Sequence, residues 1–207
     1  MSSVSILPLA GNAGDARPAA GDARYRPLPL DAYRNNTAIT AAGDLGAGAF
    51  NVWRNSYAAE YLPAGGAVTV GGVPFDFPPA GPSVADNVRC AGQFLTVPAG
   101  RYDWLHLIAA AERRTEDLIW THFADAGVEP EFLRVSDFWA APAWFGEARA
   151  FRSPVMHYPH HVQAGVSAEL WALRVPISRR GVLTGVRLPR NVAVHLFAAT
   201  LQLGVDS

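Results

Sequence analysis

Short apolar runs, separated by glycine and proline, dominate the chain from Thr37 onward. The breaks come about every 8 to 12 residues, a spacing typical of β-sandwiches and β-barrels rather than of alternating strands and helices. Residues 182–203 hold two such runs, joined at 188–191, and residues 192–203 are apolar on both alternating faces. This pattern predicts a central strand covered on both sides. We therefore expect an all-β protein, a single jelly-roll β-sandwich organised around these two strands.

Turn residues predict further strands. A Gly-Gly pair separates the apolar runs 68–70 and 73–77, which predicts a hairpin with a two-residue turn. The run 94–97 leads through a turn that contains proline and glycine to another strand that starts at Tyr102. These signals add at least four strands to the predicted sandwich.

Residues 103–117 include types that favour helix, but the aromatic and aliphatic run 102–108 favours a strand. A polar stretch follows at 112–117, and then a second apolar run at 118–123. We expect these two strands to form a hairpin. Its register places His106 directly opposite His122 on one face.

Two segments lack a regular period. Residues 1–36 are rich in Ala, Gly, Pro, Asp and Arg, and we expect an irregular N-terminal arm on a β-sandwich domain formed by residues 37–207. Residues 137–165 combine aromatic residues and three histidines with proline and glycine, and predict a long loop that crosses the domain. Long loops commonly carry function, so this segment is a candidate wall for a binding site.

Composition and charge exclude several kinds of partner. The chain has 207 residues, 50% of them hydrophobic, which is enough for one domain with a substantial core. Its formal net charge of -1 gives no reason to expect nucleic acid or an anionic membrane as partner. Cys90 is the single cysteine, which excludes an intramolecular disulfide. The N-terminus lacks a signal-peptide pattern, so we expect a cytoplasmic protein, or a secreted one if a signal was trimmed away.

Several short motifs occur in an order that resembles a known family. They are NSYAAEYLP at 55–63, GVPFDFP at 72–78, DNVRCAGQ at 86–93, THFAD at 121–125, LP at 188–189 and LFAATL at 196–201. Together they resemble the galactose-binding-like β-sandwich modules, of the carbohydrate-binding type, that are appended to bacterial glycoside hydrolases. The resemblance covers about residues 37–203 and implies a galactose-binding-like sandwich.

The resemblance also implies a protein that binds a carbohydrate or a glycosylated small molecule. Sugar recognition needs flat aromatic faces for C–H groups, together with planar polar side chains for hydroxyls. The aromatic residues in or beside the least regular segments are Trp53, Tyr57, Trp139, Trp144 and Tyr158. We expect the binding platform among them, while a place in the core is an equally good interpretation of Trp53 or Trp139.

An enzyme on the same sandwich is the alternative hypothesis. It would carry out acid-base or metal-assisted chemistry, of a lyase, cyclase or hydrolase type, on a small molecule. The candidate catalytic groups are His122, Asp125, His157, His160 and His161. Histidine suits such chemistry because its ordinary pKa lies near 6.5. The competing interpretation is that these are surface or loop histidines without a chemical role.

A divalent metal is the candidate cofactor. In the predicted hairpin, His106 and His122 are close enough to share a transition metal, with a third ligand from Asp125 or the histidines of 157–161. Calcium is the other option, because oxygen-bearing side chains lie in glycine-containing loops. These side chains are Asp44, Asp86 and Asn87. A histidine that alternates with Trp and Leu is also common in protein cores, so a structural role competes with both.

Overall fold

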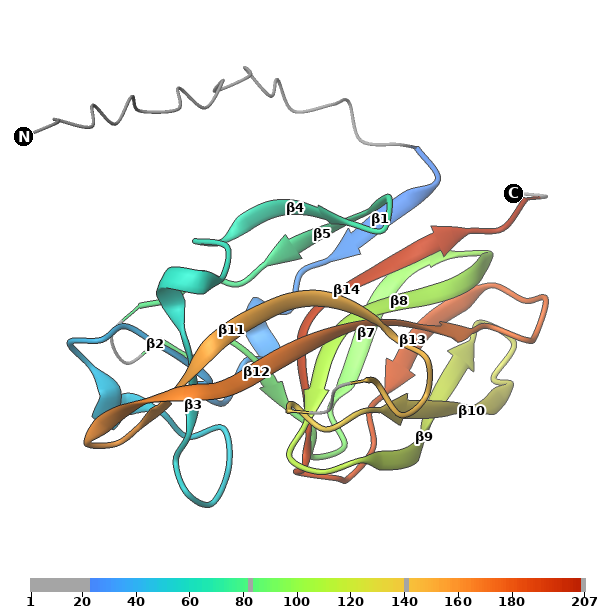
Figure 1. Ribbon diagram of the computed structural model, residues 1–207. Helices are drawn as coiled ribbons and strands as arrows, with labels where there is room; N and C mark the ends of the chain where they lie inside the picture. The colour runs from blue at the N-terminus through green and yellow to red at the C-terminus, as the bar shows by residue number, and fades with distance from the viewer. Residues whose placement is uncertain (1–22, 82–83, 140–141, 206–207) are drawn as a thin grey trace, which may run out of the picture.

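The computed structural model describes residues 23–81, 84–139 and 142–205, which form an all-β fold (Figure 1). The strands are β1 Tyr25–Leu28, β2 Ile39–Thr40, β3 Ser56–Ala58, β4 Gly66–Val70, β5 Val73–Phe77, β6 Val88–Arg89, β7 Phe94–Gly100, β8 Tyr102–Ala111, β9 Thr115–Phe123, β10 Val128–Val135, β11 Ala148–Tyr158, β12 His161–Pro176, β13 Leu183–Arg187 and β14 Val194–Leu203. The described helices are three 3-10 turns: η1 Asp31–Tyr33, η2 Leu45–Ala47 and η3 Ala59–Tyr61. Among the described residues, no helix is long and apolar enough to cross a membrane.

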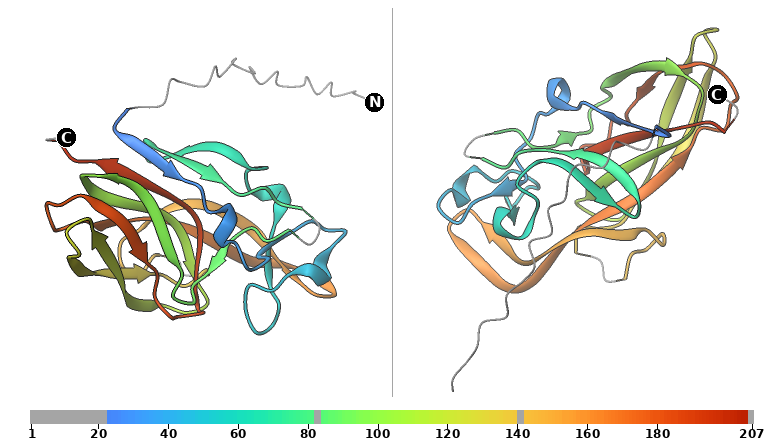
Figure 2. Two further views of the ribbon diagram at one scale, coloured as in Figure 1. Left: turned by 180° about the vertical axis from the view of Figure 1, so that it is seen from behind. Right: turned by 90° about the horizontal axis from the view of Figure 1, so that it is seen from above.

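The strands are arranged in layers. A large sheet has the order β1-β14-β8-β12-β11-β3-β2, with β6 also paired to β14. A four-stranded sheet has the order β10-β9-β13-β7, and β4 and β5 form a separate hairpin. In Figure 1 the large sheet runs through the middle, with the β4–β5 hairpin above it and the strands β9, β10 and β13 below. Figure 2 gives the same arrangement from behind and from above.

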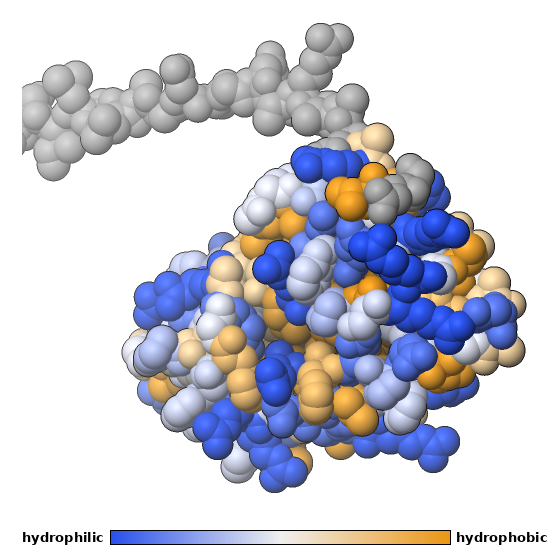
Figure 3. Space-filling view, turned by 90° about the vertical axis from the view of Figure 1, so that its right-hand side faces the viewer, coloured by the Kyte–Doolittle hydropathy of each residue, from blue (hydrophilic) through white to orange (hydrophobic). Residues whose placement is uncertain are grey.

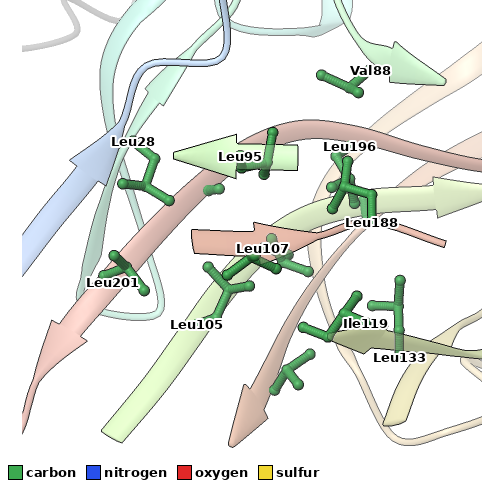
Figure 4. Packing of buried hydrophobic residues seen from close by; sticks show 14 of the residues in the cluster. Leu28, Val88, Leu95, Leu105, Leu107, Ile119, Leu133, Leu188, Leu196 and Leu201 are labelled. Atoms are coloured by element: carbon green, nitrogen blue, oxygen red, sulfur yellow. The ribbon is translucent and has the colours of Figure 1, made fainter. Parts of the chain in front are cut away.

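Aliphatic side chains fill the space between the two larger sheets (Figure 4). Leu107 and Leu196 come from the large sheet, and Leu95, Ile119 and Leu133 come from the four-stranded sheet. All five are at most 1% exposed. Burial of each such side chain contributes about 1.5 to 3 kcal/mol, so this cluster holds the two sheets together.

A second core, rich in aromatic rings, lies on the opposite face of the large sheet. Phe75 and Phe77 of β5 enter it from the hairpin, and Phe50 and Phe138 enter it from loops. The ring of Phe77 stacks on that of Phe197 in β14, with centroids 6.4 Å apart. The large sheet is therefore covered on both faces.

The predicted sandwich and several of its strands are confirmed. β14 contributes side chains to both cores, as expected for a central strand covered on two sides. β4 and β5 pair in register around Gly71 and Gly72, whose φ angles of 58° and 80° favour glycine. β13 and β14 form the two predicted C-terminal strands, but they belong to different sheets, so the connection between them crosses from one layer to the other.

The predicted hairpin of residues 102–110 and 118–123 is wrong. β8 pairs with β12 and β14 in the large sheet, whereas β9 pairs with β10 and β13 in the four-stranded sheet. The polar residues after β8 therefore carry the chain between layers instead of forming a hairpin tip. The composition of each segment indicates a strand, but it does not specify the partner strand.

The predicted long loop over residues 137–165 is also wrong for much of its length. β11 and β12 form a long antiparallel hairpin that turns at Pro159 and His160. Its register shifts between Arg149 and Phe151, and again between Ser153 and Val155. These bulges interrupt the two-residue period, which explains why the sequence pattern resembles a loop.

The predicted N-terminal arm spans residues 1–36, and its described part, residues 23–36, contains the strand β1. β1 pairs with β14, from Tyr25 opposite Gln202 to Leu28 opposite Ala199. Residues 1–22 of the predicted arm lie outside the described residues. The large sheet thus takes one of its edge strands from a segment without a strand-like pattern.

Candidate ligand-binding groove

An open groove lies between the loop that holds Trp139 and the β11–β12 hairpin. Its volume is about 530 Å³. Its lining residues are Trp139, Arg149, Arg152, Gly165, Val166, Ser167 and Glu169. Two other hollows, of about 410 and 320 Å³, lie elsewhere on the surface. We call the first one the Trp139 groove, because it combines an exposed indole with a buried carboxylate.

A bulge in β11 brings two arginines to the same side of the hairpin. Arg149 lies opposite Trp171 and Phe151 opposite Leu170, so Ala150 is an extra residue in β11. On a regular strand, residues 149 and 152 would point to opposite faces. The extra residue reverses the alternation, and both guanidinium groups reach Glu169.

Glu169 is the buried charge at the base of the groove, with a side chain only 2% exposed. Arg149 Nε lies 2.6 Å from Glu169 Oε2, and Arg152 Nε lies 3.5 Å from Glu169 Oε1. Among the described residues, no N–H or O–H points at Oε2 with the geometry of a hydrogen bond. The contact between Arg149 and Oε2 is therefore an ion pair and not a hydrogen bond. Oε2 is thus buried beneath Arg149 and is balanced by its charge rather than by a directed hydrogen bond.

The backbone of Glu169 is fixed on both sides. Its N–H donates to the carbonyl oxygen of Phe138 at 2.5 Å, and its own carbonyl oxygen accepts the hydroxyl of Tyr57 at 3.0 Å. Burial raises the pKa of Tyr57 well above its ordinary value, with a further contribution from the negative charge of Glu169, so this phenol stays a donor. The loop before the groove and the second core together set the position of the carboxylate.

The two arginines face solvent, with side chains 48% exposed for Arg149 and 51% for Arg152. Arg152 also donates from Nη2 and Nε to Ser167 Oγ, at 2.6 and 3.2 Å. Trp139 is 55% exposed, and its ring stacks on that of buried Phe138 with centroids 5.2 Å apart and planes 10° apart. The groove thus has one flat apolar surface with a fixed orientation, next to a charged base.

The other predicted platform residues lie outside this groove. Tyr57 is 1% exposed in the second core, and the half-buried ring of Tyr158 stacks on His161 at 4.9 Å. Trp53 is 65% exposed in the loop after Phe50, and Trp144 is 58% exposed under the guanidinium of Arg114. Of the five predicted aromatic residues, Trp139 alone is in the lining described for the groove.

The structure does not bring His106 and His122 together, because they lie in different sheets. His106 Nε2 is hydrogen-bonded to Gln202 Oε1 at 2.8 Å, and burial lowers the pKa of His106. The ring of His122 lies edge-on against Phe94. Within the described ranges, no three side chains of His, Cys, Asp or Glu form a group that could hold a metal ion.

The candidate catalytic histidines of the β11–β12 hairpin have different surroundings. His157 is fully buried, with Nδ1 2.9 Å from Thr40 Oγ1 and Nε2 3.8 Å from Glu60 Oε1. Burial lowers the pKa of His157, which favours the neutral ring. His160 and His161 are exposed at the turn. A buried ring and two exposed ones do not form a shared site.

Asp125, the candidate acid, lies in the turn between β9 and β10 and forms an ion pair with Arg179. This turn and the β11–β12 turn are at opposite ends of the molecule (Figures 1 and 2). The end that carries the β9–β10 turn has a mainly hydrophilic surface with scattered hydrophobic residues (Figure 3). The predicted catalytic set is therefore split between two distant places.

The candidate calcium ligands Asp86 and Asn87 are 0% exposed. The oxygens of Asp86 accept the backbone N–H groups of Ala38 and Ile39 and an N–H of the Asn87 amide. Asp44 is in the segment just before η2 and partly exposed. The thiol of Cys90 is buried, and burial raises its pKa far above the ordinary value, which disfavours a reactive thiolate.

Sequence reasoning missed Arg149, Arg152 and Glu169. One signal was present: Glu169 is the single charged residue in the run VSAELWAL, residues 166–173. A carboxylate in such a run is rarely buried without a charged partner. The identity of that partner depends on the bulge at Ala150, for which the sequence has no recognisable pattern.

Comparison with known proteins supports the architecture. No curated protein sequence matches the chain. The sequence profile of the AziU2-like β-sandwich domain matches residues 24–204, a range that includes all fourteen strands and the whole Trp139 groove. The β-sandwich implied by the motifs is thereby confirmed. The chain belongs to the AziU2-like β-sandwich domain family.

Proposed function

We propose that this protein is a carbohydrate- or glycoside-binding β-sandwich of the galactose-binding-like type, with the Trp139 groove as its binding site. The observation that carries the proposal is the exposed indole of Trp139 beside the buried, ion-paired carboxylate of Glu169. The groove joins the aromatic platform expected from the sequence to planar polar groups that the sequence did not reveal.

Each part of the groove matches one part of a sugar. The C–H groups of a pyranose ring pack well on a flat aromatic face. Sugar hydroxyls donate and accept hydrogen bonds, and the half-exposed guanidinium groups of Arg149 and Arg152 line the groove as donors. A concave site with a few fixed polar groups is typical of small-molecule binding.

The groove supports binding better than catalysis. The carboxylate of Glu169 is paired with two guanidinium groups, at 2.6 and 3.5 Å. Hydrolysis of a glycosidic bond commonly needs two carboxyl groups, and Glu169 is the one carboxylate in the described lining. The alternative enzyme, built on His122 and Asp125, has no observation in its favour.

Titration calorimetry with a panel of galactose, glucose, xylose and glucuronate tests the proposal. We expect Trp139→Ala to weaken binding of the tightest sugar by about tenfold or more, which corresponds to about 1.4 kcal/mol. The matched control is Trp53→Ala, which removes an equally exposed indole from outside the groove and should leave the affinity unchanged.

Thermal unfolding of both variants completes the test. A midpoint within about 2 °C of the parent protein is expected for Trp139→Ala, because more than half of the side chain is already in water. If no sugar in the panel binds, or if both tryptophan variants bind as the parent does, the proposed function is wrong.

A further inference from the structure

We infer that the ligand of the Trp139 groove is an acidic saccharide, a sugar that carries a carboxylate, and that Arg149 holds this carboxylate. The inference rests on the proposed function and adds the chemical class of the sugar. It follows from the distribution of charge in the groove and from the hydrogen-bonding groups that the protein leaves unused.

The groove presents positive charge to the solvent. Its described lining contains two arginines and one glutamate, and every other lining residue is uncharged. The two guanidinium groups are on side chains about half exposed, whereas the glutamate is 2% exposed beneath them. A ligand that approaches from water therefore meets the arginines first, and an anionic group on it is favoured.

The two arginines differ in how many of their guanidinium N–H groups already bind other residues. Arg152 already donates to Ser167 through two nitrogens, which fixes its guanidinium against β12. Arg149 contacts Glu169 through Nε, and its two terminal nitrogens have no partner among the described residues. A guanidinium with free terminal N–H groups matches the geometry of a carboxylate, which it can bind through two parallel hydrogen bonds.

Glu169 sets a second requirement on the ligand, in addition to the carboxylate that Arg149 binds. Its Oε2 is buried and lacks a hydrogen-bond donor among the described residues, and an anion placed next to it would be repelled. A neutral hydroxyl group is not repelled, and it can accept an N–H of the arginines that lie over Glu169. The ligand must then carry an acid group and a hydroxyl on one rigid frame with an apolar face for Trp139, and a hexuronate has all three.

Glucuronate and glucose are the probes, since they differ mainly in the carboxylate. Titration calorimetry at 20 mM NaCl should give an affinity for glucuronate about tenfold above that for glucose, in the range expected for charge-assisted hydrogen bonds. This ratio should fall toward one at 500 mM NaCl, because salt screens a half-exposed pair.

Two variants of Arg149 assign the effect to this residue. Arg149→Gln should bring the ratio of the two affinities below about threefold. Arg149→Lys keeps a positive charge beside Glu169 and thus protects the fold, but it lacks the planar fork, so the ratio should also drop. The matched control is Arg134→Gln, which removes a similarly exposed, ion-paired arginine from outside the groove and should keep the ratio.

The outcomes separate this inference from the proposed function. If glucose binds as tightly as glucuronate and both depend on Trp139, the protein is a carbohydrate binder and the acidic class is wrong. If acetate binds as tightly as glucuronate and Trp139→Ala changes neither, the groove is a plain anion site and both proposals fail. A ratio that Arg149→Gln and Arg149→Lys leave unchanged overturns the role of Arg149.

Discussion

Two buried carboxylates, Asp86 and Glu169, have opposite surroundings. Asp86 is 0% exposed, and its hydrogen-bond donors are neutral groups of the chain: the N–H groups of Ala38 and Ile39, at 2.8 to 3.1 Å, and the side-chain amide of Asn87 at 2.8 Å. Glu169 faces two charged groups that extend into solvent, and its Oε2 accepts no directed hydrogen bond from the described residues.

This difference separates a carboxylate that fastens the backbone from one that positions two surface arginines. Asp86 fastens the segment before β6 to the start of β2, and Asn87 continues the network to His195 Nδ1 at 2.8 Å. Its hydrogen bonds are used inside the protein, so nothing remains for a ligand or a calcium ion. Glu169 is held in place by its backbone, and its carboxylate positions the two arginines that face the groove.

The largest expected effect is on stability, from Asp86→Ala. The change leaves the buried backbone N–H groups of Ala38 and Ile39 without their acceptor, while the Asn87 amide loses one contact and keeps those to Asn36. We expect the free energy of unfolding to fall by about 4 kcal/mol, measured by urea denaturation. Asp125→Ala is the control, because its carboxylate is 60% exposed, and it should cost less than about 1 kcal/mol. Equal losses in the two variants would contradict the structural role of Asp86.

The second effect is the pH dependence that Asp86 gives to stability. Burial raises the pKa of Asp86 to about 6, against the opposing effect of its hydrogen bonds, while the ordinary value is 3.8. The folded state thus binds the proton more tightly than the unfolded state. The stabilisation is fully present below pH 3.8 and is lost as the pH rises through about 6.

Asp86→Asn isolates this contribution, since asparagine keeps the shape but does not titrate. The stability of the parent protein relative to Asp86→Asn should decrease by roughly 2 kcal/mol between pH 4.5 and 7, measured by urea denaturation. The neutral, buried His157 and His195 have lowered pKa values and act in the opposite direction, but they are present in both proteins and cancel. A difference that stays constant with pH would show that the carboxyl of Asp86 has an ordinary pKa.

The smallest effect in free energy is expected for Glu169→Gln, and it should appear in binding rather than stability. Glutamine keeps the volume of the side chain but removes the charge that holds Arg149 and Arg152 in position. Affinity for glucuronate should fall about tenfold, with the unfolding midpoint within about 2 °C of the parent protein. Glu116→Gln, which changes an exposed partner of Arg134, is the control. Loss of stability without loss of affinity would make Glu169 a second structural carboxylate like Asp86.

Much of the fold could be predicted because single strands have local signatures. The Gly-Gly turn specifies the β4–β5 hairpin, and the uninterrupted apolar run of β14 indicates burial on both faces. Sheet membership could not be predicted in the same way. β8 and β9 are close in sequence, but their partners β12, β13 and β14 are far along the chain, and pairing at that distance depends on the packing of whole layers.

The Trp139 groove likewise combines residues that the sequence could predict with residues that it could not. Trp139 was found from its type and its irregular surroundings, which are local properties. Arg149 and Arg152 could not be predicted, because they lie on the same side of the hairpin only through the extra residue Ala150. The sequence pattern of this strand resembles a loop, so it does not reveal the bulge. Residues 106 and 122 were placed together by a register that assumed a hairpin. The predicted metal site therefore rested on the wrong pairing of β8 with β9.

The pairing of β14 also constrains how the protein folds during synthesis. β14 hydrogen-bonds to β1, β6 and β8, and each of these strands is made before it. While the ribosome is still translating residues 194–203, the edge of β8 that later pairs with β14 is open, and β1 has no partner strand. Unpaired strand edges are sites of aggregation. The nascent chain therefore exposes these strand edges until β14 has emerged and paired with them.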